Sequence, residues 1–221
     1  MRRSTFTDHS VSYGAIGATL APDLLRYPPA GYRPSEQSVR IGSGRERFER
    51  ASASLMTWGV QEGAGLFVTD VETGNGEQYL GLVYGPDGTP LPEQPSREGE
   101  QREQREQRVD ERGVPFVAPG MTALIRHPRR GLERRHQVRV LVVFVIDEPD
   151  RVCFAIGTMD GPESGEESFL LEHREDDTVW LTIRSIFRPA EWRAALGAAL
   201  RRRRERLTRL ELRALHPAGG V

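Results

Sequence analysis

The polar side chains best placed to do chemistry lie on one predicted strand, residues 166–175. Side chains alternate between the two faces of a strand, so Glu167 and His173 share a face with Phe169 and Leu171. The two apolar residues indicate that this face points inward. Burial moves the pKa of a carboxyl or an imidazole toward neutrality, which suits ligand binding or proton abstraction in a cavity. The alternative is that Glu167 and His173 lie at the rims of the sheet and contact water.

Two apolar residues on neighbouring elements complete the candidate site. Ile183 lies on the predicted strand 177–189, and Trp192 lies on the apolar side of a predicted helix over 190–215. The candidate ligand-binding residues are therefore Glu167, Phe169, His173, Ile183 and Trp192. No catalytic residue can be named, because the sequence contains no HExxH, CxxC, GxSxG or Walker motif. The sequence predicts no cofactor and no metal site, and Cys153 is interpreted as an inert thiol.

The composition is typical of one soluble globular domain. Hydrophobic residues make up 37% of the 221 residues and charged residues 29%, and no run approaches the ~20 apolar residues that span a bilayer. A single cysteine cannot form an intramolecular disulfide, so we expect a cytoplasmic protein. The net charge of -1 gives no strong nucleic-acid signal. The oligomeric state stays undetermined.

The codon preferences implied by the composition point to a source. All 31 basic residues are arginine, and Asn75 is the single asparagine. Arginine has GC-rich codons, whereas lysine and asparagine have AT-rich ones. We therefore expect a GC-rich bacterial genome, and an actinobacterial one in particular.

The pattern of hydrophobic residues and turns predicts an α+β fold. A first strand over 32–42 leads into a helix whose predicted capping box joins Ser43 to Glu46. The remaining predicted strands are 64–71, 78–85, 121–127, 136–149, 151–159, 166–175 and 177–189. Their tight connections near residues 148–150 and 176–177 require antiparallel neighbours. A long helix over 190–215 then covers the sheet, and the space between them can form a cavity.

The domain organisation follows from the same pattern. Residues 1–31 are predicted to form an N-terminal arm that packs on a single domain, residues 32–216. The repeated Arg-Glu-Gln triplets of 92–113 cannot bury enough apolar surface to fold, so this insertion is predicted to be disordered. Trp180 should lie on the outer face of the sheet, where Tyr13 or Tyr27 of the arm would cover it.

The C-terminal helix carries a dense run of arginines. Four successive residues, Arg201–Arg204, surround the helix, so at least one of them must face the sheet. A buried guanidinium needs a charged partner, and Glu167 is a candidate for it. The outward arginines are either a solvated helix face or a patch for anionic lipid or RNA.

Several segments resemble a known family. They are PPAGYR (28–33), GSGRERFERASASLMTW (42–58), VIDEPDRVCFAIGTMDGPESGEESFLLE (145–172) and DTVWLTIRSIFRPAEW (177–192). These residues resemble the bacterial and plant family called domain of unknown function nineteen-ninety. The resemblance implies a START/Bet v 1-like helix-grip fold, in which a curved antiparallel sheet wraps a long C-terminal helix. It implies no activity, because none is established for the family.

These observations lead to one main hypothesis and two alternatives. The main hypothesis is a helix-grip protein that binds a small apolar or lipid-like ligand between sheet and helix. The first alternative is an enzyme, a cyclase or hydrolase, that uses Glu167 and His173 in the same cavity. The second is a surface-binding adaptor that uses the arginine-rich helix above a filled core.

Overall fold

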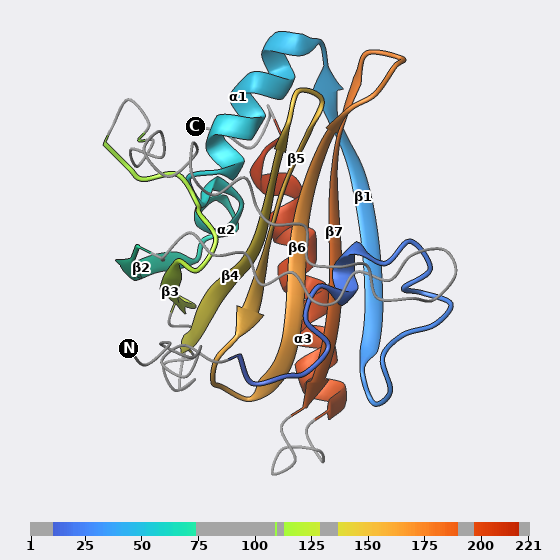
Figure 1. Ribbon diagram of the computed structural model, residues 1–221, viewed down its shortest axis with the longest axis vertical. Coiled ribbons are helices and arrows are strands. Elements are labelled where there is room, and N and C mark those ends of the chain that lie inside the picture. The colour runs from blue at the N-terminus through green and yellow to red at the C-terminus, as the bar shows by residue number, and fades with distance from the viewer. Residues whose placement is uncertain (1–10, 74–108, 110–112, 129–136, 190–196, 217–221) are drawn as a thin grey trace, which may run out of the picture.

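Alternating apolar residues and tight turns produce one antiparallel sheet. The computed structural model describes residues 11–73, 109, 113–128, 137–189 and 197–216. Within that part of the chain, seven strands pair in the order β1-β7-β6-β5-β4-β3-β2 (Figure 1). Their bounds are β1 (Arg33–Ser43), β2 (Phe67–Glu72), β3 (Thr122–Arg126), β4 (Gln137–Glu148), β5 (Arg151–Thr158), β6 (Glu163–His173) and β7 (Thr178–Pro189). Because β1 pairs with β7, the first and last strands of the chain are neighbours.

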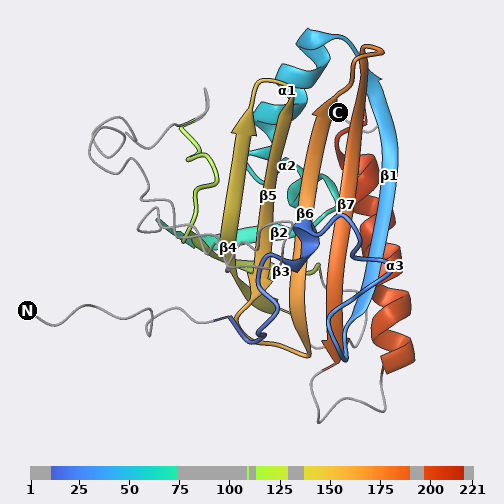
Figure 2. The ribbon, with the colours of Figure 1, turned by 45° about the vertical axis from the view of Figure 1, so that its right-hand side comes forward.

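Among the described residues, three α-helices cover one face of the curved sheet. They are α1 (Arg45–Leu55), α2 (Gly59–Gly63) and α3 (Gly197–Ala214), and α3 runs along the length of the sheet (Figures 1 and 2). A curved antiparallel sheet around a C-terminal helix is the helix-grip fold that the sequence predicted. The predicted strand 78–85, almost all of the insertion 92–113 and residues 190–196 of the predicted helix lie outside the described residues.

The start of α1 differs from the predicted capping box. Ser43 is the last residue of β1, and the N-cap is Gly44, with φ 91° and no side-chain hydrogen bond. The N-cap carbonyl accepts from Phe48, and Glu46 lies in the first turn, where a negative charge stabilises a helix. The capping-box prediction was wrong because the strand extends through the residue that would have supplied the hydroxyl group.

The inner face of the sheet carries the main hydrophobic core. Register places Phe154, Phe169 and Ile183 side by side across β5, β6 and β7, and each is almost fully buried. Trp58 meets the Phe154 ring edge-on, with the centroids 5.6 Å apart. The prediction that Phe169 faces inward is therefore confirmed, and it follows from the period of two along a strand.

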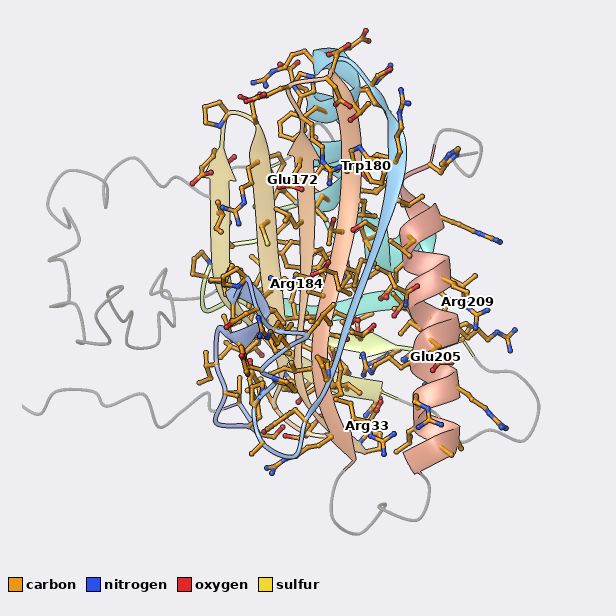
Figure 3. The ribbon with its side chains drawn as sticks, turned by 90° about the vertical axis from the view of Figure 1, so that its right-hand side faces the viewer. Arg33, Glu172, Trp180, Arg184, Glu205 and Arg209 are labelled. Carbon is orange, nitrogen blue, oxygen red and sulfur yellow. The ribbon has the colours of Figure 1, made fainter. Side chains whose placement is uncertain are left out.

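The N-terminal arm, residues 11–31, crosses the outer face of the sheet (Figure 2). Its anchor is the carboxylate of Glu166, which is fully buried. Glu166 accepts hydrogen bonds from the Tyr13 hydroxyl (2.7 Å), the Gly17 amide (2.7 Å), the Thr19 amide (3.1 Å) and the Thr19 hydroxyl (2.5 Å). Arg184 also reaches the arm, and its guanidinium donates to the carbonyls of Thr19 and Ala21 (Figure 3).

Trp180 is covered differently from the prediction. Tyr13 lies against Gly157 and Glu166, and Tyr27 is 63% exposed. Trp180 lies under the Arg174 guanidinium, 4.4 Å from the ring centroid, and donates from Nε1 to the Thr178 hydroxyl. The arm does not cover Trp180 because the buried carboxylate of Glu166 holds the arm elsewhere on the sheet. Trp180 pairs with Glu172, six residues along β6 from Glu166.

Candidate functional site

The face of α3 that points at the sheet is unusually polar. Its residues are Leu200, Arg204, Thr208 and Glu211, at spacings of four, four and three, and Leu215 continues this face directly after the helix. Thr208 and Glu211 are each less than 5% exposed, and the side chain of Arg204 is 21% exposed. A helix that covers a sheet normally buries an apolar stripe, because a polar group loses its water on burial. Packing alone therefore does not explain the middle of this stripe.

Arg204 joins α3 to two carboxyls on β6. Its Nη2 lies 3.1 Å from Oε2 of Glu163, and its Nη1 lies 3.5 Å from Oε2 of Glu167. The guanidinium also lies 3.2 Å from the centroid of the Phe187 ring, a cation–π contact. The prediction that an inward arginine pairs with Glu167 is confirmed.

A small cavity of about 70 Å³ lies beside these charges, between the sheet and α3. Most of its wall is apolar, from Leu66, Ile125, Val138, Val140, Ile156, Pro162, Phe187 and Leu207. The polar part of the wall consists of His127, Thr158, Glu163, Glu167, Arg203, Arg204 and Glu211. An apolar space with its polar groups gathered together is typical of a small-molecule site.

Several buried polar atoms at this end of the core have no hydrogen-bond partner among the described residues. They include Oε1 of Glu167, Oε2 of Glu211 and Nε of Arg204. Two other interior groups also have no hydrogen-bond partner among the described residues: the side-chain amide of Gln61 and Nε1 of Trp58. Buried polar groups are nearly always hydrogen-bonded in folded proteins, so such a set requires an explanation.

Burial changes the acidity of two of these carboxyls. Loss of water raises the pKa of Glu167, the positive charge of Arg204 opposes that rise, and the charge of Glu163 adds to it. Burial raises the pKa of Glu211 well above its ordinary value, and the nearby Glu167 raises it further against the effect of Arg204. Since Arg204 forms its ion pair with Glu167, a proton shared by the two carboxyls is favoured on Glu211.

His173 lies at the other end of β6, away from the cavity. Its Nε2 lies 2.8 Å from Asp177 and its Nδ1 3.4 Å from Asp150, and its ring stacks on Phe48. The hydrogen bond with Asp177 is the main reason that its pKa is raised. Six residues along a strand separate it from Glu167, about 20 Å. The hypothesis of a shared Glu167–His173 cavity is therefore wrong.

The other candidate residues have different positions. Phe169 and Ile183 lie in the packed core next to the site and are not part of the cavity wall. Trp192 lies outside the described residues.

Sequence reasoning missed Glu163 and Glu211. The signal that could have identified Glu211 is its place seven residues after Arg204, on the same helix face.

Two further properties concern the described part of the chain. No group of three or more His, Cys, Asp or Glu side chains within it is arranged to hold a metal ion. None of its helices is long and apolar enough to cross a membrane.

Cys153 is buried on the outer side of the sheet, and this burial raises the pKa of its thiol to about 12.

Comparison with known proteins identifies a family. The sequence matches the family described as "Domain of unknown function (DUF1990)" over residues 12–87 and 100–214, as the resemblance implied. It is also 29% identical, over 196 residues, to a "UPF0548 protein" of Deinococcus radiodurans. That alignment covers 84% of this chain and 80% of the relative.

Solved structures resemble the fold. The hypothetical protein jhp0584 from Helicobacter pylori aligns with a TM-score of 0.51 at 8% sequence identity, covering 98% of this chain and 100% of that one. The Zhui aromatase/cyclase from Streptomyces sp. R1128 aligns with a TM-score of 0.46 at 12% identity, over 86% of this chain and 99% of that one. At these identities the likeness concerns the fold alone.

Proposed function

This chain belongs to the DUF1990 family, and from that premise we propose that it binds a small, mostly apolar molecule with one polar group between the sheet and α3. The observation that carries the proposal is the buried polar stripe of α3 at the end of an apolar cavity. Apolar residues of similar size would fill this space at a lower free-energy cost. Stability is commonly lost in this way where side chains serve a function.

The unpartnered atoms indicate how the ligand would be held. Oε1 of Glu167, Oε2 of Glu211 and Nε of Arg204 can offer acceptors and donors to one polar group. The apolar wall, including Val140, Ile156 and Leu207, would contact the rest of the molecule. A ligand with a polar group and an apolar part would give these polar atoms hydrogen-bond partners and would also contact the apolar wall.

The size of the cavity limits the ligand. A volume of about 70 Å³ is roughly half that of an engineered cavity of about 150 Å³ that binds benzene. A ligand of more than a few heavy atoms therefore requires α3 to move away from the sheet. The C-terminal end of α3 is packed closely on α2, where a Cβ at Gly63 would lie 2.7 Å from that of Ala214. Movement is thus expected at the N-terminal end.

The cavity also favours ligand binding over the adaptor hypothesis, because that hypothesis requires a filled core beneath the helix. A cytoplasmic location is part of the proposal, since the chain has a single cysteine and that cysteine is buried.

Native mass spectrometry of protein purified from its own host tests the proposal. Leu207→Trp places an indole in the cavity wall, whereas Leu210→Trp changes an exposed residue of the same helix and is the matched control. We expect a small co-purifying mass in the wild type and in Leu210→Trp, and its loss in Leu207→Trp. Wild-type protein that carries no bound molecule would contradict the proposal.

A further inference from the structure

Two carboxyls face the same small space from different elements. Glu167 projects from β6 and Glu211 from α3, and the two residues are at most 4% exposed. The cavity is small, about 70 Å³, roughly half the volume of the engineered cavity that binds benzene. Any ligand group inside it must therefore lie close to both carboxyls.

The surroundings of these two carboxyls differ. Oε2 of Glu167 accepts from Arg204, which favours the ionised form, while its Oε1 is free of partners among the described residues. Glu211 receives no such bond from the described residues, and the charge of Glu167 raises its pKa further. Because Arg204 pairs with Glu167, it favours the carboxylate there, and a proton shared by the two carboxyls is held at Glu211.

Other charged or titratable groups also face this space. Glu163 comes from β6, Arg203 and Arg204 come from α3, and His127 follows β3. Glu163 forms an ion pair with Arg204, so its carboxylate is already engaged. Within the described part of the chain, Glu167 and Glu211 are the carboxyls at this space with a buried oxygen that has no hydrogen-bond partner.

We propose that Glu167 and Glu211 transfer protons on a bound neutral carbonyl compound, with Glu167 as the base and Glu211 as the acid. Glu167 takes a proton from the carbon next to the carbonyl group, and the electron pair of that C–H bond forms a C=C bond. The electron pair of the C=O bond takes the proton of Glu211, so an enol forms. Return of the two protons gives back the ketone or, from an unsaturated ketone, an isomer with a shifted double bond. The reaction consumes no oxidant or reductant.

The substrate class follows from the charges and the wall. The carboxylates of Glu163 and Glu167 balance the guanidinium groups of Arg203 and Arg204, so the space has no net attraction for an anion, whereas a neutral carbonyl oxygen can accept the proton of Glu211. The apolar wall fits a hydrocarbon substituent. This inference rests on the proposed ligand binding, because the reacting carbon must lie in the same cavity.

Deuterium uptake into butanone tests the proton transfer. The wild-type protein is incubated with butanone in D₂O, and loss of the proton signals next to the carbonyl is followed by NMR. Glu167→Gln removes the base, and we expect the protein-dependent rate to fall by about 10²–10⁴-fold. Glu211→Gln keeps a hydrogen-bond donor, so a smaller fall is expected. Glu205→Gln, on the exposed side of α3, is the control and should exchange like the wild type.

The dependence on pH separates the two roles. The wild-type rate should pass through a maximum, because the reaction needs an ionised Glu167 and a protonated Glu211. Glu211→Gln should lose the fall in rate at high pH and keep the fall at low pH. Equal rates in the wild type and in both site variants would overturn the inference.

Binding is measured in the same samples by saturation transfer from protein to butanone. Binding without protein-dependent exchange contradicts proton transfer and leaves the proposed ligand binding intact. Absence of both contradicts the two proposals together. Circular dichroism of each variant establishes that it is folded, and Glu211→Gln provides the test on its own if Glu167→Gln does not fold.

Discussion

Replacing Glu211 by methionine should make the protein more stable. The side chain is 2% exposed and Oε2 has no hydrogen-bond partner among the described residues. A buried polar group without its hydrogen bonds costs about 1–3 kcal/mol, and methionine has a similar length with no such group. We therefore expect the free energy of unfolding to rise by about 2 kcal/mol, within the range measured when buried charged residues are replaced by apolar ones.

Urea unfolding measures this change. In thermal unfolding of a chain of this length, the same gain of about 2 kcal/mol corresponds to a rise in Tm of roughly 4–8 °C. The urea concentration at the unfolding midpoint should rise without a change in the slope m, since the surface exposed on unfolding stays the same. Glu205→Met is the matched control. Glu205 lies on the exposed side of α3 (Figure 3), 3.8 Å from Arg201, so its replacement should change stability by no more than about 0.5 kcal/mol.

The gain should also depend on pH. Because the pKa of Glu211 is raised in the folded state, the folded protein binds more protons than the unfolded chain above the ordinary glutamate pKa. Wild-type stability therefore falls as the pH rises from that value through the raised pKa, and the methionine variant lacks this contribution. A loss of more than about 1 kcal/mol at neutral pH in Glu211→Met would refute the reasoning, since it would mean that the carboxyl contributes to the fold.

Three other predictions concern groups outside the cavity. Glu166→Gln should destabilise the protein by about 2–4 kcal/mol, because an amide cannot accept all four hydrogen bonds from the arm; hydrogen exchange at Thr19 should rise with it. For His173, a raised pKa means that the protonated ring stabilises the fold below the ordinary histidine pKa and loses this effect as the pH rises through the raised value. Urea unfolding should therefore show a larger difference between wild type and His173→Gln at about pH 6 than at about pH 9; a constant difference would contradict this. Cys153 should not react with a thiol reagent such as dithionitrobenzoate until the protein unfolds, and rapid reaction of the folded protein would show that the thiol is accessible.

The sequence predicted the sheet well because its strands obey simple alternation. Phe169 faces the core as expected, and the short connections made the neighbouring strands antiparallel. The position of the arm was harder to predict. The four hydrogen bonds that the arm donates to the buried carboxylate of Glu166 decide it, and nothing in the alternation distinguishes Glu166 as that anchor.

The site was predicted only in part. The pairing of Glu167 with an inward arginine followed from the cost of an unpaired buried charge, and Arg204 meets that expectation. The inclusion of His173 was wrong because a strand pattern gives the face of a residue but not how far a cavity extends along it. Glu211 was missed because the rotation of an arginine-rich helix is set by contacts with the sheet. Leu210, directly before Glu211, is 43% exposed although it is the apolar residue of the two.

A methyl NMR titration with butanone tests most directly whether the cavity between the sheet and α3 is a ligand site. Binding there should shift the methyl resonances of the wall, from Ile125, Val138, Val140, Ile156 and Leu207, and leave those of the outer face, from Val143, Ile146 and Leu170, unchanged. Leu207→Trp should abolish the shifts and Leu210→Trp should keep them. Shifts confined to the outer face, or wall methyls that do not respond at all, would contradict the account.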